Sequence, residues 1–178
     1  MPANLNELED IPMIPKIKKI LYATDLSENA RFAFGYAASL ANQYNAGITI
    51  LHVVEVASAS ANLHLVSLLG EERWQQIMRQ NTAEILDTVK ERLDQFCEDM
   101  KADDQTCRFI VDDIVVRQGH AVEEILAQAE TVGYDVIVMG TQGHGILAGA
   151  LMGSTARRVV RRALTPVLVV RLPEEEME

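Results

Sequence analysis

The sequence predicts an α/β protein whose parallel sheet is covered by helices on both faces. Short segments that are apolar almost without interruption alternate along the chain with segments of helical period. Strands of that composition are buried on both faces, which is the environment that a parallel sheet between helices provides. Since crossovers between parallel strands are right-handed, few topologies remain. Glycines and polar residues follow the strands, where such sheets bind their ligands.

The first strand and helix are predicted after an N-terminal arm. Residues 1–15 carry three prolines and an acidic cluster, which favours a segment outside the core. Residues 16–23 are predicted as the first strand. Ser27 suits the N-cap of the next helix, with Glu28 in its first turn. One face of that helix is apolar and small: Ala30, Phe34, Ala37, Ala38 and Ala41.

The middle of the chain contains a second strand, a long helix and a third strand. Residues 48–54 are predicted as the second strand, and residues 55–70 show no clear period. A long helix starts at Glu71, and its apolar stripe comprises Trp74, Ile77, Met78, Ile85, Val89, Leu93 and Phe96. We expect Asp112 and Asp113 to split the third strand, with its main part at residues 114–116.

Two further strands and two helices complete the domain. A helix over residues 121–132 buries Val122, Ile125, Leu126 and Ala129. The fourth strand is expected at residues 135–139 and the last helix at 156–164. Thr165-Pro166 ends that helix, and residues 167–170 form the fifth strand. The remainder is an acidic tail.

Composition limits the classes of function. The chain has 178 residues, enough for one domain with a full core, and a formal net charge of −10. That charge argues against nonspecific binding to nucleic acid or to an anionic membrane, because both need a basic face. Cys97 and Cys107 fit neither a disulfide framework nor a metal site. With no signal-peptide pattern and no apolar run near the roughly 20 residues of a membrane span, we expect a soluble cytoplasmic protein.

The glycines after the fourth strand indicate a phosphate site. Gly140 and Gly143 follow the strand, and nine residues later Gly153 precedes Ser154 and Thr155 at a helix start. Glycines let the backbone approach an anion, the first-turn N–H groups point at it, and the two hydroxyls add donors. The alternative is an ordinary strand-to-helix loop with glycines for flexibility.

The ends of three strands are expected to meet at one cleft. Asp25, residues 53–54 and Gly140 leave strands one, two and four, and ligands bind such sheets where the strand order reverses. The Asp25 carboxylate suits the two hydroxyls of a ribose. Its alternative role is to stabilise the dipole of the helix that follows.

Histidines and arginines near this cleft have simpler interpretations. His52 is expected to be a packed strand residue rather than a catalyst, and no triad spacing is present. His120 and His144 lie in or beside turns near the cleft. For His144 there are two interpretations, a contact with phosphate and an ordinary solvated position in a loop. The last helix carries four arginines, which are expected to complement its dipole and to pair with surface acids: Arg157, Arg158, Arg161 and Arg162. For Arg157 and Arg158 the alternative is a contact with phosphate.

Two other nucleotide signatures do not fit. A Walker motif is absent because no lysine follows a glycine of the loop. Residues 143–148 match the dinucleotide-binding pattern G-x-G-x-x-A. That pattern should open a helix directly, whereas the helix here is expected to begin at Gly153. The acidic residue that a dinucleotide-binding site carries roughly 20 residues further on is also missing.

With these residues placed, the chain resembles the universal stress protein family in its nucleotide-binding branch. The resemblance covers about residues 16–171 and leaves the arm and the tail, residues 172–178, outside. Its most specific element is the glycine pattern, since relatives that lack it generally do not bind ATP. The matching segments are 19–27, 50–54, 136–140, Gly140-x2-Gly143-x9-Gly153-Ser154 and 165–170.

The resemblance implies a Rossmann-like fold and a set of ligand contacts. The sheet has five parallel strands in the order 3-2-1-4-5, and the ligand is ATP, ADP or AMP, with or without Mg²⁺. Asp25 would contact the ribose, and the Val53 backbone would bind the adenine edge. The phosphates would be held by Gly140, Gly143, Gly153, Ser154 and Thr155. The implied site is completed by Ala23 (proline in many relatives), Thr24, Met139 and His144.

The family is usually homodimeric, and the fifth strand suits the contact. Residues 167–170 lie at the sheet edge in this strand order and are wholly apolar. An exposed apolar edge is a liability unless a strand covers it, and a two-fold axis lets the edge cover itself.

The resemblance therefore predicts an ATP-binding, homodimeric sensor or regulator of the stress response. The alternatives are a slow ATPase or nucleotide hydrolase on the same cleft, and a nucleotide-free dimer that binds a protein partner. No evident general base lies beside the phosphates, which disfavours efficient catalysis. The intact glycine pattern argues against the nucleotide-free alternative. The sequence identifies neither the protein partner nor the stress signal.

Overall fold

A computed structural model describes residues 14–55, 59–102, 109–141 and 152–172. Five strands form a single parallel sheet in the order β3-β2-β1-β4-β5, which confirms the order that the family resemblance implies. The strands are β1 (Lys19–Thr24), β2 (Gly47–Glu55), β3 (Ile110–Gly119), β4 (Val136–Gly140) and β5 (Val167–Val170).

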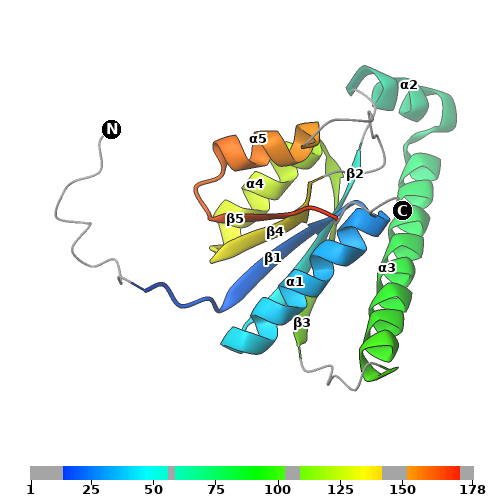
Figure 1. Ribbon diagram of the computed structural model, residues 1–178. Helices are drawn as coiled ribbons and strands as arrows, with labels where there is room; N and C mark the ends of the chain where they lie inside the picture. Colours follow the sequence, from blue (N-terminus) through cyan, green and yellow to red (C-terminus); the bar gives the residue numbers. More distant parts are fainter. Residues whose placement is uncertain (1–13, 56–58, 103–108, 142–151, 173–178) are drawn as a thin grey trace, which may run out of the picture.

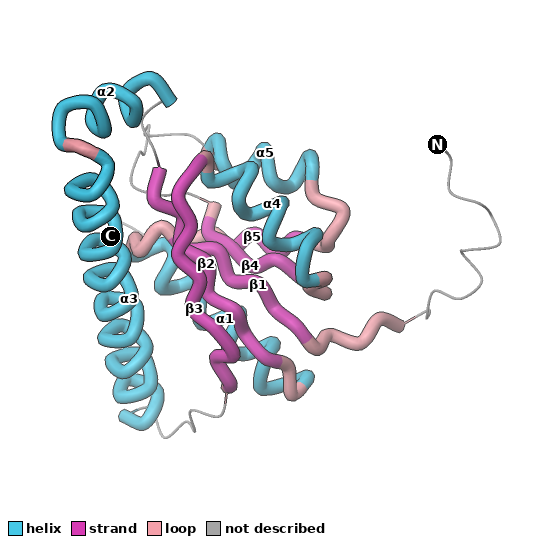
Figure 2. Tube along the Cα trace, turned by 180° about the vertical axis from the view of Figure 1, so that it is seen from behind, coloured by secondary structure: helices cyan, strands magenta, loops and turns pink. Residues whose placement is uncertain are grey.

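Helices cover both faces of the sheet (Figure 1). The helices α1 (Glu28–Tyr44) and α3 (Glu71–Ala102) pack on one face, and α4 (Ala121–Val132) and α5 (Ser154–Arg162) pack on the other. The view from behind in Figure 2 shows the same layers. No helix in the described ranges is both long and apolar enough to cross a membrane.

The pleat of the strands divides the core into two clusters. On β1, Ile20 and Tyr22 pack toward α1 and α3, whereas Leu21 and Ala23 pack toward α4 and α5. The small face of α1 lets this helix lie close to the sheet, and its five predicted residues are all buried. The predicted N-cap is also confirmed, because the Ala30 N–H donates to Oγ of Ser27 over 3.2 Å.

The helix α2 (Ala59–Leu69) occupies a segment for which the sequence predicts no element. Most of its residues are small or apolar, so the contrast between a polar and an apolar face that would mark a helical period is weak. The helix contacts one end of α3, and it leaves Leu63 and Leu68 more than 70% exposed (71% and 73%).

The prediction that Asp112 and Asp113 split the third strand is wrong. The strand β3 is continuous, and its register against β2 pairs Ile48 with Val111 but Thr49 with Asp113. Asp112 is therefore the extra residue of a β-bulge, which the sheet accommodates at this edge without ending the strand. Gly47 makes room for it, because a methyl group there would lie 1.7 Å from Oδ2 of Asp112.

Candidate functional site

A cavity of about 290 Å³ opens at the carboxyl ends of β1, β2 and β4. The strand order reverses between β1 and β4, which is where sheets of this kind bind ligands. The structure brings nine of the eleven predicted site residues together around this cavity, and Gly143 and His144 lie outside the described residues. The nine are Ala23, Thr24, Asp25, Val53, Met139, Gly140, Gly153, Ser154 and Thr155.

The cavity has an apolar floor and a polar rim. Leu51, Ile125 and Met139 line the floor and are at most 5% exposed. Hydroxyl and carboxylate side chains lie at the rim, where Asp25 and Thr155 are half-buried. An apolar floor with a few convergent polar groups is typical of sites for small organic ligands.

The turn after β1, residues 24–27, is held by two of its own side chains. The Leu26 N–H donates to Oγ1 of Thr24, and the Ser27 N–H donates to Oδ1 of Asp25, each over 3.0 Å. Between them Leu26 has a φ of 63°, in the left-handed region that a leucine seldom adopts. Asp25 therefore contacts the start of α1, as its alternative role predicts, and it lines the cavity as well.

The first turn of α5 borders the cavity from the other side. Its N-cap is Gly153, which has no side chain to accept from the first-turn N–H groups, and no acidic residue lies in that turn. The Gly153 N–H itself donates to the carbonyl of Thr141 over 2.6 Å, which ties the helix start to the end of β4. The positive end of the helix dipole thus lies beside Ser154 and Thr155.

The strand β2 runs past its neighbour at the cavity. The last residues that pair between β1 and β2 are Thr24 and His52, so Val53 lies one residue beyond that ladder. His52 is half-buried, and its Nδ1 lies 2.9 Å from the Thr24 carbonyl oxygen. It is a packed strand histidine, as expected.

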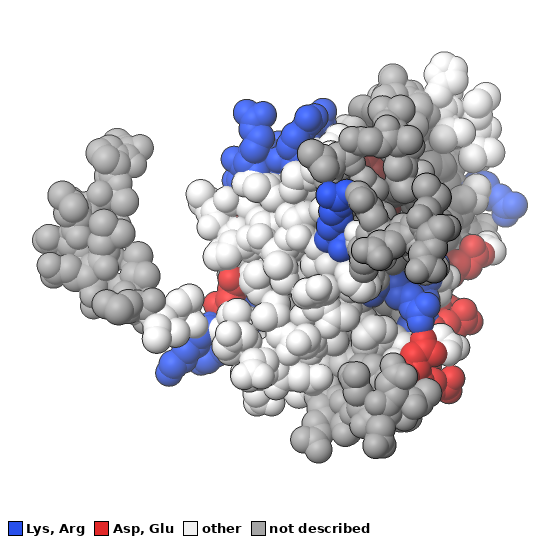
Figure 3. Space-filling model, viewed as in Figure 1, with Lys and Arg blue, Asp and Glu red and all other residues white. Residues whose placement is uncertain are grey.

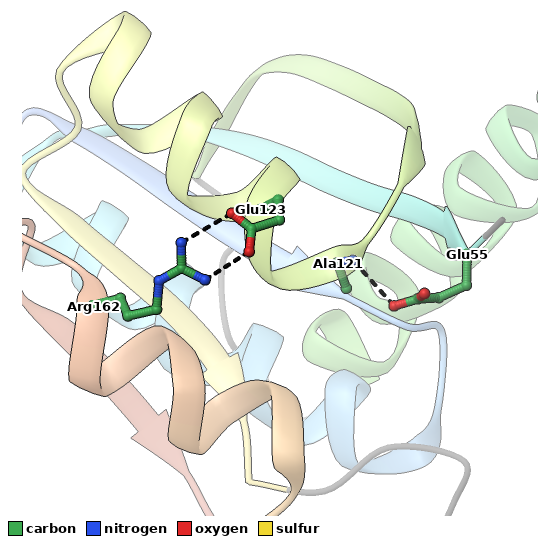
Figure 4. A network of polar contacts seen from close by, with 4 residues as sticks. All are labelled: Glu55, Ala121, Glu123 and Arg162. Atoms are coloured by element: carbon green, nitrogen blue, oxygen red, sulfur yellow. Dashed lines mark hydrogen bonds and ion pairs between the residues drawn. The ribbon is translucent and has the colours of Figure 1, made fainter. Parts of the chain in front are cut away.

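Glu55 is a cavity residue that the sequence reasoning missed. Its Oε1 accepts the N–H of Ala121 over 3.0 Å (Figure 4). Its Oε2 lies 3.5 Å from Nδ1 of His120. This carboxylate joins the end of β2 to the start of α4. The N-cap residue of that helix, His120, makes no side-chain hydrogen bond to the first turn. The period of two along the strand was a usable signal, because it places Glu55 on the same face as Leu51 and Val53.

A bidentate ion pair joins the two helices beside the cavity. Arg162 donates from Nη1 and Nη2 to the two carboxylate oxygens of Glu123, over 2.6 and 3.0 Å (Figure 4). The hydrogen bond from Arg162 lowers the pKa of Glu123, and the same bond raises the pKa of Arg162. This is the surface pairing expected for the last helix, over which basic side chains gather in Figure 3. Within the described chain, Arg157 and Arg158 are not among the cavity-lining residues.

Residues 16–171 match the pattern that defines the Universal stress protein family. The chain belongs to the universal stress protein family. Among the relatives, the universal stress protein MJ0577 of Methanocaldococcus jannaschii is 31% identical over 154 residues, which are 86% of this chain and 94% of the relative.

Solved structures of universal stress proteins share this fold. The structure of MJ0577 is 27% identical and superposes with a TM-score of 0.68, covering 90% of this chain and all of that one (100%). A universal stress protein of Archaeoglobus fulgidus in complex with dAMP has a TM-score of 0.52 at 20% identity, over 87% of this chain and 98% of its own. A universal stress protein in complex with cAMP has a TM-score of 0.55 at 20% identity, over 88% and 98%.

In this universal stress protein, the cavity offers backbone and oxygen groups rather than a cluster of metal ligands. Among the described residues, no group of three or more His, Cys, Asp or Glu side chains could hold a metal ion. Thr141 is a second lining residue that the sequence reasoning missed, although it directly follows Gly140. The chemistry of the described site is that of hydrogen bonding to a polar ligand over an apolar floor.

Proposed function

We propose that this universal stress protein binds an adenine nucleotide, ATP in the first instance, in the cavity at the carboxyl ends of β1, β2 and β4. The observation that carries the proposal is the position of Asp25 and the first turn of α5 on the rim of one apolar cavity. In the cell it would act as a nucleotide-dependent regulator of the stress response, as a cytoplasmic homodimer.

The two ends of the cavity suit different parts of a nucleotide. The base would lie over the floor beside Val53, whose backbone lies beyond the β1–β2 ladder and would bind the adenine edge. Asp25 would accept from the ribose hydroxyls. The phosphates would lie at Gly153 and Ser154, where the helix dipole of α5 favours an anion.

The ligands of two structural neighbours support the adenine class. A universal stress protein was solved with dAMP and another with cAMP, and both ligands are adenine nucleotides with a single phosphate. The cavity, at about 290 Å³, is near the lower limit of small-molecule sites, about 300 Å³. A mononucleotide is a suitable occupant.

Calorimetric titration of the purified protein with ATP, AMP and GTP, with and without Mg²⁺, tests the proposal. We expect the adenine nucleotides to bind and GTP to bind much more weakly, because a fixed backbone donor and acceptor cannot match the reversed pattern of guanine. Mass spectrometry of ligand released from the protein identifies the nucleotide carried in the cell. Equal affinity for ATP and GTP would contradict the base contact, and ATP turnover measured with and without Mg²⁺ would favour the hydrolase alternative if it were detected.

A further inference from the structure

We propose that Arg92, on α3, is a positioning residue for the nucleotide site that acts through the Asp25 loop, residues 24–27. The inference rests on the proposed function, because it assigns Asp25 to the ribose. The helix α3 packs on the face of the sheet opposite α4 and α5 (Figures 1 and 2), and none of its described residues lines the nucleotide cavity.

The coupling runs through a single peptide group. Nη1 of Arg92 donates to the carbonyl oxygen of Leu26 over 2.5 Å, across 66 residues of sequence. The same peptide group carries the Ser27 N–H, which donates to Oδ1 of Asp25. A peptide group is planar, so its C=O and N–H rotate together. The direction in which Arg92 holds the carbonyl therefore sets the direction of the N–H that holds the Asp25 carboxylate.

The backbone at Leu26, which precedes this peptide group, has an unfavourable conformation that other contacts must stabilise. Leu26 has a φ of 63°, and the side chain of a leucine makes that left-handed conformation unfavourable. Such conformations persist only where the surrounding contacts determine them. Arg92 supplies one contact from α3, and Oγ1 of Thr24 supplies another by accepting the Leu26 N–H.

A small cavity lies behind the loop, on the side of α3. It has a volume of about 40 Å³ and is lined by Leu26, Val89, Arg92 and Phe96. Thr24 lines both this cavity and the nucleotide cavity. Leu26 also packs against the apolar cluster on this face of the sheet, and the hydrogen bond from Arg92 adds a directional contact that holds the Leu26 carbonyl toward α3.

Arg92→Ala, Arg92→Lys and the control Arg79→Ala test this role by calorimetry with ATP and with 2′,3′-dideoxy-ATP. Arg79 is an exposed arginine earlier in α3. Arg92→Ala should weaken ATP binding about three- to tenfold, the equivalent of one hydrogen bond. The affinity for the dideoxy nucleotide should change much less, because it lacks the hydroxyls that Asp25 would contact. Arg92→Lys should restore most of the ATP affinity, and Arg79→Ala should leave it unchanged.

A second measurement separates this inference from the proposed function. Amide hydrogen exchange at Ser27 in the nucleotide-free protein should be faster in Arg92→Ala than in wild type or Arg79→Ala. Unchanged exchange, unchanged ATP affinity, or an equal loss for both nucleotides would each overturn the positioning role. If wild type bound no adenine nucleotide, the proposed function would fail, and the exchange rate would still decide whether Arg92 holds the loop.

Discussion

The guanidinium of Arg162 meets the carboxylate of Glu123 through two hydrogen bonds, of 2.6 and 3.0 Å. The two residues come from α5 and α4, the helices that flank the cavity at the carboxyl ends of the strands. Both side chains are at least half exposed (50% and 57%), so water and salt weaken their attraction. The pair is therefore a pH-dependent contact rather than a main source of stability.

Glu123→Gln should reduce the free energy of unfolding near neutral pH and have no effect in acid. The pKa of Glu123 is lowered in the folded protein, so the pair stabilises the fold above the unfolded-chain value of about 4.3 and loses that effect as pH falls through the lowered pKa. Urea denaturation at about pH 7 and about pH 3 measures the difference. Glu98→Gln, at an exposed glutamate of α3, is the control, and a pH-independent difference would contradict the prediction.

Gly153→Val should abolish binding of the phosphates while the protein stays folded. Gly153 has a φ of −64° and a ψ of 160°, which any residue adopts, so the backbone tolerates a side chain. A branched side chain at this N-cap blocks the approach of an anion to the N–H groups of α5. Calorimetry with ATP and circular dichroism measure the two effects, and Gly153→Ala should lie between wild type and Gly153→Val. Wild-type ATP affinity in both variants would place the phosphate site elsewhere.

Asp25→Ala should weaken ATP binding by about 1–3 kcal/mol, the usual scale for a hydrogen bond to a charged group. Asp25→Asn is the matched control, because its amide oxygen can still accept the Ser27 N–H and preserve the loop. The Asn variant should therefore retain the stability of wild type in urea while losing part of the ATP affinity. The ribose assignment would be wrong if both variants bound ATP as wild type does.

Leu168→Lys should convert a dimer into a monomer. The strand β5 lies at the sheet edge, and we predict that it pairs with its copy in a second chain. A lysine in the middle of the strand places two like charges near the two-fold axis, where desolvation makes their repulsion costly. Multi-angle light scattering measures the mass. Leu164→Lys is the control, because Leu164 is 89% exposed and precedes the strand. A dimeric Leu168→Lys variant would exclude this edge, and a monomeric wild type would exclude the dimer.

Local patterns predict most of the fold. The helix over residues 121–132 has the predicted bounds because its apolar residues keep a clear period and Gly133, with a φ of 71°, ends it. Nine cavity residues follow from motifs at strand ends and at the start of the last helix, together with the family resemblance. The helix α2 is not predicted, because its mostly small and apolar residues show no clear helical period.

The other features that could not be predicted depend on contacts between residues that are far apart in the sequence. The role of Glu55 depends on Ala121, and the role of Arg92 depends on Leu26, each 66 residues away. Asp112 fits within β3 beside Gly47 of the neighbouring strand, which leaves space for its side chain. Such roles depend on a partner that only the folded chain brings close.

The two edges of the sheet are chemically unlike, which would limit the number of chains in any assembly formed through sheet edges. The β3 edge carries the bulge at Asp112 and a second exposed carboxylate at Asp113, and both resist the docking of another strand. The β5 edge offers only Val-Leu-Val-Val. Association through β5, as we predict it, would use the receptive edge of each molecule and would therefore stop at two chains. A sheet with two receptive edges would instead add molecules without limit and grow into a fibre.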